Sequence, residues 1–247
     1  MAEIYAPDLT QRFGAPPDIE GAVDDNEALH RILGRRTHRA YSDKRVPEAL
    51  LDVLVSAALS ASSKSDFQQA SIIRVIDPAK RAALAALIPA MPWIGTSPIF
   101  YVFCGDARRL ERLCDLRGHP QGNGRLEGFF NAAVDAALVM QTFILAAESV
   151  GLGVCPISVI RNHPDAVGEI LGLPDKVFPV AGLCIGWPAG AGFVSMRLPP
   201  AVTVHVDRYD DGDMPGLVDD YDRRRDARHS IPPDKQRAPQ KFGTLLD

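Results

Sequence analysis

The sequence has few cysteines, and none of them stands in a metal-binding or redox pattern. Only four occur among 247 residues, Cys104, Cys114, Cys155 and Cys184, and no two form a C-x-x-C pair. Cys104 and Cys184 lie inside apolar runs, where a thiol usually packs as a small hydrophobic group. The six histidines show no zinc-ligand spacing with these cysteines. We therefore expect reduced, structural thiols in a cytoplasmic protein, and no metal site.

Other common signals are also missing. The first twenty residues contain acidic residues and prolines but no apolar core of a signal peptide. No G-x-S-x-G nucleophile motif occurs, and no acidic metal-binding pattern stands out. A formal net charge of -4 makes general binding to nucleic acid unfavourable. These absences favour a soluble protein that is neither secreted nor a nucleophile-based hydrolase.

The longest apolar stretch, Ala132 to Val150, is better explained by a buried helix than by a membrane span. It contains Asp135, Gln141 and Glu148, which are costly to place in lipid. Apolar residues surround nearly its whole circumference, so we predict a central, buried helix from about 130 to 150.

Hydrophobic periodicity predicts further helices and strands along one folded domain. We expect helices at 24–34, from 47, at 81–88, at 106–116 and from 164, and strands at 71–76, 99–104, 177–185 and 201–206. Residues 118–128 are rich in glycine and polar side chains and are expected to form a loop. The domain should span residues 24–210. We expect residues 1–23 to form an extended arm and residues 211–247 a second terminal arm with few core anchors.

Three well-separated segments carry groups suited to one anionic ligand, and the first is Arg35-Arg36-Thr37-His38-Arg39. Guanidinium groups form bidentate hydrogen bonds with phosphate, and the hydroxyl of Thr37 adds a donor. If the segment forms a helical turn, Arg35 and Arg39 share a face. A solvated, basic helix end would account for the same residues.

A separate candidate is the neutral polar loop at 60–69, which contains Ser63, Ser65 and Gln68. Its neutral donors and acceptors suit a heterocycle with alternating polar edges, such as the pyrimidine part of a flavin. An ordinary serine-rich loop is the alternative.

The second segment suited to an anionic ligand is the turn Gly151-Leu152-Gly153, and the third carries Arg197, a lone cation. Glycine permits positive φ and close approach of the backbone to a flat ligand. A plain helix cap and a surface arginine are the alternatives here. A dinucleotide-binding motif would need its glycines between a strand and a helix, whereas here a helix precedes the turn and a strand follows, so we reject a Rossmann fold.

Taken in order, these features resemble the nitroreductase family, in its branch of oxygen-insensitive NADPH nitroreductases and NADPH-dependent flavin reductases. The matching pieces extend over most of the chain, from about residue 30 to 210. They are RRTHRAYSD (35–43), ASSKSDFQQASIIRVID (61–77), YVFC (101–104), AAESVGLGVCPISVIRN (146–162), LGLPDKVFPVAGLCIGWP (171–188) and RLP (197–199).

The resemblance implies an α+β fold with a central mixed or antiparallel sheet, flanking helices and a long buried helix. It also implies a homodimer with FMN bound at the dimer interface and intertwined terminal arms. The implied activity is that of an oxidoreductase: NAD(P)H reduces the flavoprotein and leaves, and an electron-poor acceptor such as a nitroaromatic, a quinone or free flavin then binds. The flavin N5 carries the hydride, so no side chain is expected to act as a catalytic acid or base.

Carried over by position, the resemblance assigns roles to specific residues. Arg35, Arg36, Thr37 and Arg39 match the segment that binds the FMN phosphate and ribityl chain, and Arg197 matches a further phosphate arginine. Ser63, Ser65 and Gln68 match the loop beside the flavin ring, and Gly153 with the backbone of Val154 matches the turn against it. Arg225 is a candidate for the 2′-phosphate of NADPH.

The chain departs from the family pattern at several of these places. Arg35 replaces a usual histidine, and Ser195 replaces a lysine. Met91 stands where a glutamine is expected and Trp93 where another aromatic residue is expected, both on the acceptor side of the pocket. These departures leave two alternatives open: a specialised relative that fragments flavin or dehalogenates small aromatics, and a non-catalytic dimer that binds a phosphate ligand.

Overall fold

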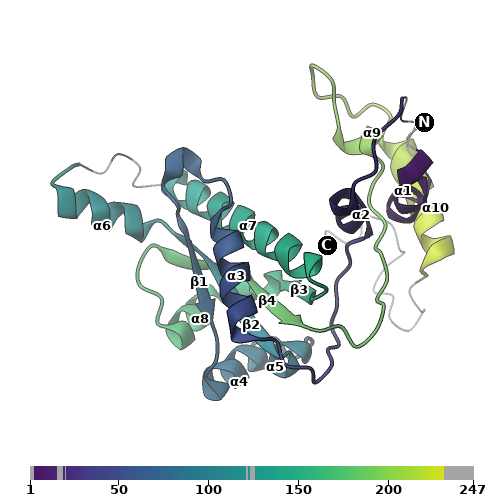
Figure 1. The fold of residues 1–247 in the computed structure, drawn as a ribbon. Coiled ribbons are helices and arrows are strands. Elements are labelled where there is room, and N and C mark those ends of the chain that lie inside the picture. Colours follow the sequence, from purple (N-terminus) through teal and green to yellow (C-terminus); the bar gives the residue numbers. More distant parts are fainter. Residues whose placement is uncertain (1–2, 16–18, 20, 121, 123–125, 231–247) are drawn as a thin grey trace. The chain divides into compact units, whose positions relative to one another are not determined.

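The computed structural model describes residues 3–15, 19, 21–120, 122 and 126–230 of the chain, drawn as a ribbon in Figure 1. The chain divides into two compact units, Arg36–Gly192 on the one hand and Met1–Arg35 with Phe193–Asp247 on the other. The predicted domain limits at 24 and 210 both fall within the second of these. Much of the predicted C-terminal arm, residues 231–247, lies outside the described residues.

The unit Arg36–Gly192 is built on a four-stranded antiparallel sheet with the order β1-β2-β4-β3. The strands are β1 (Ala70–Arg74), β2 (Ile99–Asp106), β3 (Gly153–Ile157) and β4 (Val177–Gly186). The helices are α3 (Glu48–Leu59), α4 (Pro78–Ala86), α5 (Trp93–Thr96), α6 (Arg108–Arg117), α7 (Leu126–Ser149) and α8 (Pro164–Leu171), with short turns of 3₁₀ helix η2 (Lys64–Asp66) and η3 (Ser158–Asn162). The predicted α+β fold with an antiparallel sheet is confirmed.

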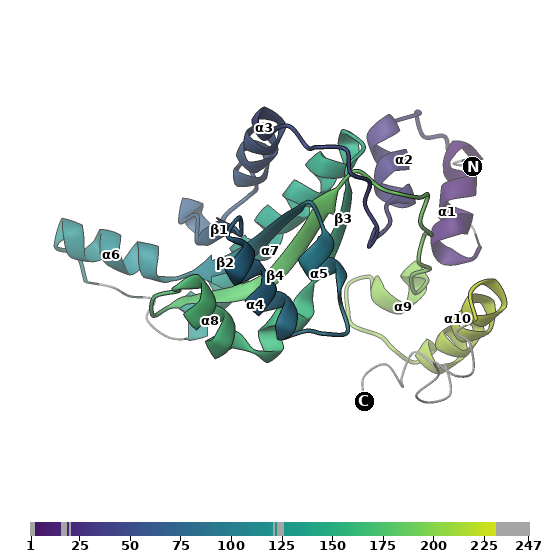
Figure 2. The same ribbon diagram turned by 90° about the horizontal axis from the view of Figure 1, so that it is seen from below.

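Helices cover both faces of this sheet, as Figure 2 shows with α3 and α7 on one side and α4, α5 and α8 on the other. The continuous apolar run of β2 explains this arrangement, because successive side chains point to opposite faces. Tyr101 and Phe103 pack toward α7, whereas Phe100, Val102 and Cys104 pack on the other side. This strand is therefore covered on both faces, and the strand predicted at 99–104 is confirmed.

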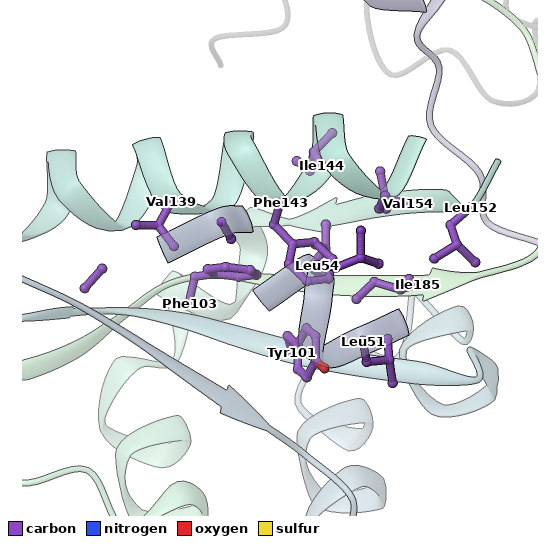
Figure 3. Packing of buried hydrophobic residues seen from close by; sticks show 14 of the residues in the cluster. Leu51, Leu54, Tyr101, Phe103, Val139, Phe143, Ile144, Leu152, Val154 and Ile185 are labelled. Atoms are coloured by element: carbon purple, nitrogen blue, oxygen red, sulfur yellow. The ribbon is translucent and has the colours of Figure 1, made fainter. Parts of the chain in front are cut away.

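Aromatic contacts dominate the core between the sheet and α7 (Figure 3). Phe143 meets Tyr101 edge to face, with ring centroids 5.4 Å apart, and Phe103 at 5.9 Å. Phe143 is fully buried, and burying such a side chain stabilises a fold by about 1.5–3 kcal/mol. This packing holds α7 across the sheet.

The central position of α7 matches the prediction, but only one face of the helix is buried within the chain. Asp135, Val139 and Phe143 belong to the buried face. Phe130, Val134 and Leu138, spaced four residues apart, are 62%, 39% and 41% exposed. The helix is also long and apolar enough to cross a membrane by length and composition, a test that core helices of globular proteins pass as well.

The other unit joins both ends of the chain. It contains η1 (Glu3–Tyr5), α1 (Ala6–Phe13), α2 (Glu27–Gly34), α9 (Pro200–Thr203) and α10 (Met214–Arg228). The side chain of Asn26 caps α2 by accepting from the N–H of Ala28 at 2.9 Å. The buried Arg12 donates to the carbonyls of Leu33 at 2.7 Å and Ser195 at 2.8 Å.

Two predictions about this unit were wrong. The expected extended arm at 1–23 contains α1, which starts with Pro7 in its first turn and ends at Gly14 with φ +79°. α1 has only Leu9 and Phe13 as large apolar residues at helical spacing, too few for the pattern to be recognised, whereas α2, which is equally short, has Leu29, Ile32 and Leu33. The expected strand at 201–206 is instead the short helix α9, because Pro200 fits a first helical position.

Candidate functional site

The arginine segment lies beside the glycine turn, although more than a hundred residues separate them in sequence. Thr37 forms a parallel bridge with Val154, and the N–H of His38 donates to the carbonyl of Val154 at 3.0 Å. Because β3 is the edge strand of the sheet, the segment from Arg36 to Arg39 continues the sheet at that edge. Two of the three segments singled out in the sequence therefore meet at one place.

The arginine segment is extended and does not form a helical turn. α2 ends at Gly34, and Arg35 has φ −59° and ψ 144°. Neighbouring side chains consequently face opposite ways. Arg36 donates to the carbonyl of Ala191 at 3.2 Å, whereas the guanidinium of Arg39 lies 5.4 Å from the ring centroid of Trp93.

Gly153 is required for close packing and not for an unusual backbone angle. Its φ is not positive, and a Cβ built there would meet His38 Cβ at 2.8 Å and Pro188 Cγ at 2.9 Å. Gly151 does have a positive φ of +86° and ends α7. His38, for which the sequence predicts no role, thus packs the arginine segment against the turn.

Trp93, which was predicted to lie on the acceptor side of the pocket, is close to Arg39 of the arginine segment. Its indole N–H is buried and lies beside the thiol of Cys155. Met91 precedes it in the turn that leads into α5, where the carbonyl of Met91 accepts from the N–H of Ile94 at 3.0 Å. Arg36, Thr37, Arg39, Gly153 and Val154 therefore form one group with Trp93 close by, which we call the arginine cluster.

Arg81 fixes α5 from beneath, a role that the sequence did not reveal. Its guanidinium donates to the carbonyls of Ile94 and Ser97, the latter at 2.9 Å, and lies 4.7 Å from the ring centroid of Phe100. Burial without a carboxylate partner among the described residues lowers the pKa of Arg81 below its ordinary value. This half-buried cation holds the segment that carries Trp93.

The cysteines near this cluster are structural. Burial raises the pKa of Cys184 to about 12, and it also raises the pKa of Cys155, outweighing the effects of Arg39 and Trp93. All four cysteines are free thiols. No group of three histidine, cysteine or acidic side chains within the described part of the chain could hold a metal ion.

The serine loop, defined here as Ser63–Gln69, forms a second group. The hydroxyl of Ser63 donates to Asp135 at 2.9 Å and accepts from the N–H of Gln68 at 2.6 Å. Ser65 and Gln68 are exposed, and both have positive φ, 51° in each case. The hydroxyl of Ser63 is therefore used within the protein, whereas the side chains of Ser65 and Gln68 face solvent.

The serine loop and the arginine cluster lie at opposite ends of the unit. The loop is attached to α7 at Asp135, whereas the glycine turn follows the last residue of that helix, Ser149. At 1.5 Å per residue, the helix separates the two attachment points by about 20 Å. The strand pairing shows the same separation. Ala70, which follows the serine loop, pairs with Gly105 at one end of β2, whereas Gly153 pairs with Gly186 at the far end of β4.

A cavity of about 490 Å³ lies between α6 and the turn from α8 to β4. Asp106, Arg108, Arg109 and Leu173 are among the residues that line it. Arg109 also donates to the carbonyl of Gln68 and, at 2.9 Å, to Asp106. The cavity therefore borders the base of the serine loop and is distinct from the arginine cluster.

Three predicted residues belong to the unit formed by the chain ends. The N–H of Arg197 donates to the carbonyl of Arg12 at 2.8 Å, and its guanidinium donates to the carbonyl of Met196 at 3.3 Å. Arg35 follows α2, and its carbonyl accepts from Arg12 at 2.5 Å. Arg225 lies on α10 and is half-buried.

Comparison with known proteins places this fold and these residues in a family. The family model described as "Nitroreductase family" matches residues 32–187. The chain is 37% identical over 186 residues to the FMN reductase (NADPH) of Bacillus subtilis strain 168, covering 74% of this chain and 75% of that protein. It is 38% identical over 182 residues to the oxygen-insensitive NADPH nitroreductase of Salmonella typhimurium strain LT2, covering 73% and 74%.

A solved structure agrees. The NfrA1 nitroreductase from B. subtilis superposes with a TM-score of 0.82 and 32% identity, over 89% of this chain and 90% of that one. The fold of this chain, with its antiparallel sheet and long central helix, is thus similar to that of a solved nitroreductase, as its sequence is to those of known reductases. The chain belongs to the nitroreductase family, and the resemblance inferred from its motifs is confirmed.

Proposed function

We propose that this chain is an FMN-dependent NAD(P)H oxidoreductase that reduces nitroaromatics, quinones or free flavin. The observation that carries the proposal is the contact between the arginine segment and the glycine turn, made through Thr37 and Val154. It sets the arginine segment against the backbone of the glycine turn, and a phosphate attached to a flat ring system requires a guanidinium close to such a backbone. The names of the similar reductases from B. subtilis and S. typhimurium support the same activity.

The residues present fit the phosphate of FMN. Arg39 is exposed and forms no ion pair among the described residues. Arg36 and Thr37 stand beside it on the same extended segment, and the bridge to Val154 fixes that segment. Arg39 would hold the phosphate, and Thr37 would bind the ribityl chain. Arg36, whose side chain faces Ala191 on the other side of the extended segment, remains a proposed phosphate ligand. Arg35 and Arg197, which belong to the other unit, remain proposed phosphate ligands.

The flavin ring would lie against the backbone of Gly153 and Val154. His38 and Pro188 fill the space where a side chain at Gly153 would be, so the turn presents backbone rather than side chain. When bound, FMN supplies the ring that takes up hydride from NAD(P)H and delivers it to the acceptor. Met91 and Trp93 would border the acceptor. The residues of the chain would bind the flavin, orient the acceptor and exclude water from the site.

The arrangement of the serine loop supports a homodimeric site. Within one chain this loop and the arginine cluster are attached about 20 Å apart along α7. If both touch one flavin ring, a second copy must supply the serine loop. The exposed apolar side chains of Phe130, Val134 and Leu138 give α7 a face suited to such a contact.

Mixed dimers test the shared site directly. Coexpressed Arg39→Ala and Gln68→Ala chains would form a heterodimer with one doubly impaired and one intact site. We expect that heterodimer to bind about one FMN at wild-type affinity, whereas each homodimer binds weakly. If the two lesions lay within one site of each chain, the heterodimer would have no intact site.

The reductant and the place of action complete the proposal. Arg225 would contact the 2′-phosphate of NADPH, since a guanidinium suits that group. The protein would act in the cytoplasm. Steady-state oxidation of NADPH by a quinone or a nitroaromatic tests the activity, measured on protein stripped of FMN with and without added FMN. Turnover by the stripped protein without FMN would contradict it.

A further inference from the structure

A buried carboxylate lies behind the serine loop. Asp135 is 0% exposed, in the middle of the buried face of α7. Its Oδ2 accepts from the hydroxyl of Ser63 and from the N–H of Gln69, both at 2.9 Å, and its Oδ1 accepts from the N–H of Lys64 at 3.0 Å. Both oxygens only accept hydrogen bonds, which is the pattern of a carboxylate.

Burying this carboxylate destabilises the fold, and no cation among the described residues offsets that cost. None of the ion pairs formed by the described residues includes Asp135. Burying a charge costs several kcal/mol unless hydrogen bonds replace its water. An apolar residue would fit the surrounding core, which includes Ala132, Ala136 and Val139. The hydrogen bonds of Asp135 go only to the serine loop, so its visible effect is on the shape of that loop.

The serine loop needs such support because its backbone is strained. Ser65, Asp66 and Gln68 have φ of 51°, 57° and 51°, although none is glycine. Left-handed conformations of this kind cost about 1–3 kcal/mol each and persist only where surrounding contacts enforce them. Asp135 supplies these contacts at both ends of the loop, since it binds Ser63 and Lys64 at the start and Gln69 at the finish.

We propose that Asp135 is the positioning residue of the flavin site: it holds the serine loop in the left-handed shape that presents Ser65 and Gln68 to the flavin ring. The inference rests on the proposed function for its link to FMN. Asp135 does not touch the flavin. It acts through the backbone of Lys64 and Gln69 and through the hydroxyl of Ser63.

The test is Asp135→Asn in the full-length protein. The amide keeps the size of the carboxylate but has only one acceptor oxygen. Whichever way it is turned, its NH₂ group faces the N–H of either Lys64 or Gln69. We expect hydrogen exchange of the peptide spanning residues 63–69 to become at least about tenfold faster, and FMN to bind at least about tenfold more weakly, the scale of one lost hydrogen bond to a charged group.

The matched control is Val139→Ala, one turn further along the buried face of α7. It loosens the same helix without removing an acceptor from the loop, so neither exchange at 63–69 nor FMN affinity should change. If Asp135→Asn does not fold, Ser63→Ala removes one of the three donors and should produce the same two changes in milder form.

The outcomes distinguish the role of Asp135 in shaping the serine loop from the proposed flavin site. Unchanged exchange and unchanged FMN affinity in Asp135→Asn would overturn the positioning role, as would equal effects in Val139→Ala. Faster exchange in a protein whose wild type binds no FMN would keep the role of Asp135 in shaping the loop but refute the flavin site. The visible circular dichroism of bound flavin adds a third readout, since a misplaced loop changes the surroundings of the ring and a loss of stability alone does not.

Discussion

The side chain of His38 occupies the space that a side chain at Gly153 would need, with 2.8 Å between His38 Cβ and a Cβ built on the glycine. The contact joins the start of the unit Arg36–Gly192 to the strand that follows its central helix. The glycine at this position is explained by that close packing, so substituting it should disturb both the fold and the proposed FMN site.

Gly153→Ala should lower the free energy of unfolding by about 1–3 kcal/mol, the usual penalty for overpacking a filled site. It should also weaken FMN binding, because His38 must move. Thermal unfolding and FMN titration measure the two effects. Gly168→Ala is the control: nothing lies within 4 Å of its added Cβ, it sits in α8, and the change should be neutral or slightly stabilising. Equal melting temperatures for both variants would refute the packing argument.

Arg39→Ala should weaken FMN binding by about 1.5–3 kcal/mol, the contribution of a charge-assisted hydrogen bond to phosphate. Fluorescence titration of FMN measures it. Arg112→Ala removes an arginine of similar exposure from α6, away from the arginine cluster, and should leave the affinity unchanged. An unaltered affinity in Arg39→Ala would show that the cluster is wrongly assigned.

Leu138→Glu should separate the proposed homodimer, because it places a charge in the middle of the apolar face of α7. We expect the dissociation constant of the dimer to rise at least about a hundredfold, equivalent to about 2.7 kcal/mol, with loss of FMN. Sedimentation measures the oligomeric state. Ile76→Glu, at a residue that is 75% exposed outside that face, is the control. A dimer that survives Leu138→Glu unchanged would place the interface elsewhere.

Arg225→Ala should raise the KM for NADPH more than the KM for NADH, since only NADPH carries the 2′-phosphate. Steady-state kinetics with both nucleotides give the two ratios. Arg223→Ala, two residues away on α10, removes an arginine that pairs with Asp220 at 2.9 Å and should affect neither ratio. Equal effects on both nucleotides would remove Arg225 from the nucleotide site.

His30 should make the stability of the α1–α2 pair depend on pH. Hydrogen bonds to Asp8 at 2.5 Å and Asp25 at 2.8 Å raise its pKa above 6.5. The stabilisation is therefore complete below the unfolded-state pKa and is lost as the pH rises through the higher folded-state pKa. Thermal unfolding should show stability falling above about pH 6.5, and less steeply in His30→Gln than in the control His119→Gln. The same slope in both variants would contradict this.

The fold could be predicted well wherever a local pattern decides the structure. The apolar runs of β2 and β4 and the length of α7 follow from burial on both faces of the sheet, so their predicted limits are close to those observed. The helices α1 and α9 could not be predicted, because α1 has only two large apolar residues at helical spacing and α9 has four residues in all, whereas α2 and α8 have three such residues in the same length as α1. The extended form of Arg36–Arg39 escaped prediction as well, since it depends on pairing with Val154.

The candidate site shows the same division. Its residue types could be recognised from the sequence, but their grouping could not. Asp135 and Ser63 are 72 positions apart, and nothing local to either residue reveals that they meet. Likewise, the residue types of the serine loop and the arginine segment suit one ligand, which suggests that they lie together. In the structure, the serine loop and the arginine cluster lie at the two ends of α7.

The most direct test of the central claim is an anaerobic visible spectrum of the purified protein with FMN, before and after addition of NADPH. The account predicts that NADPH bleaches the bound flavin and that a quinone or a nitroaromatic restores the colour. A bound flavin that stays oxidised with both NADPH and NADH would contradict the reductase and favour a specialised flavin-binding relative. A colourless protein that takes up no FMN would refute the flavin site itself.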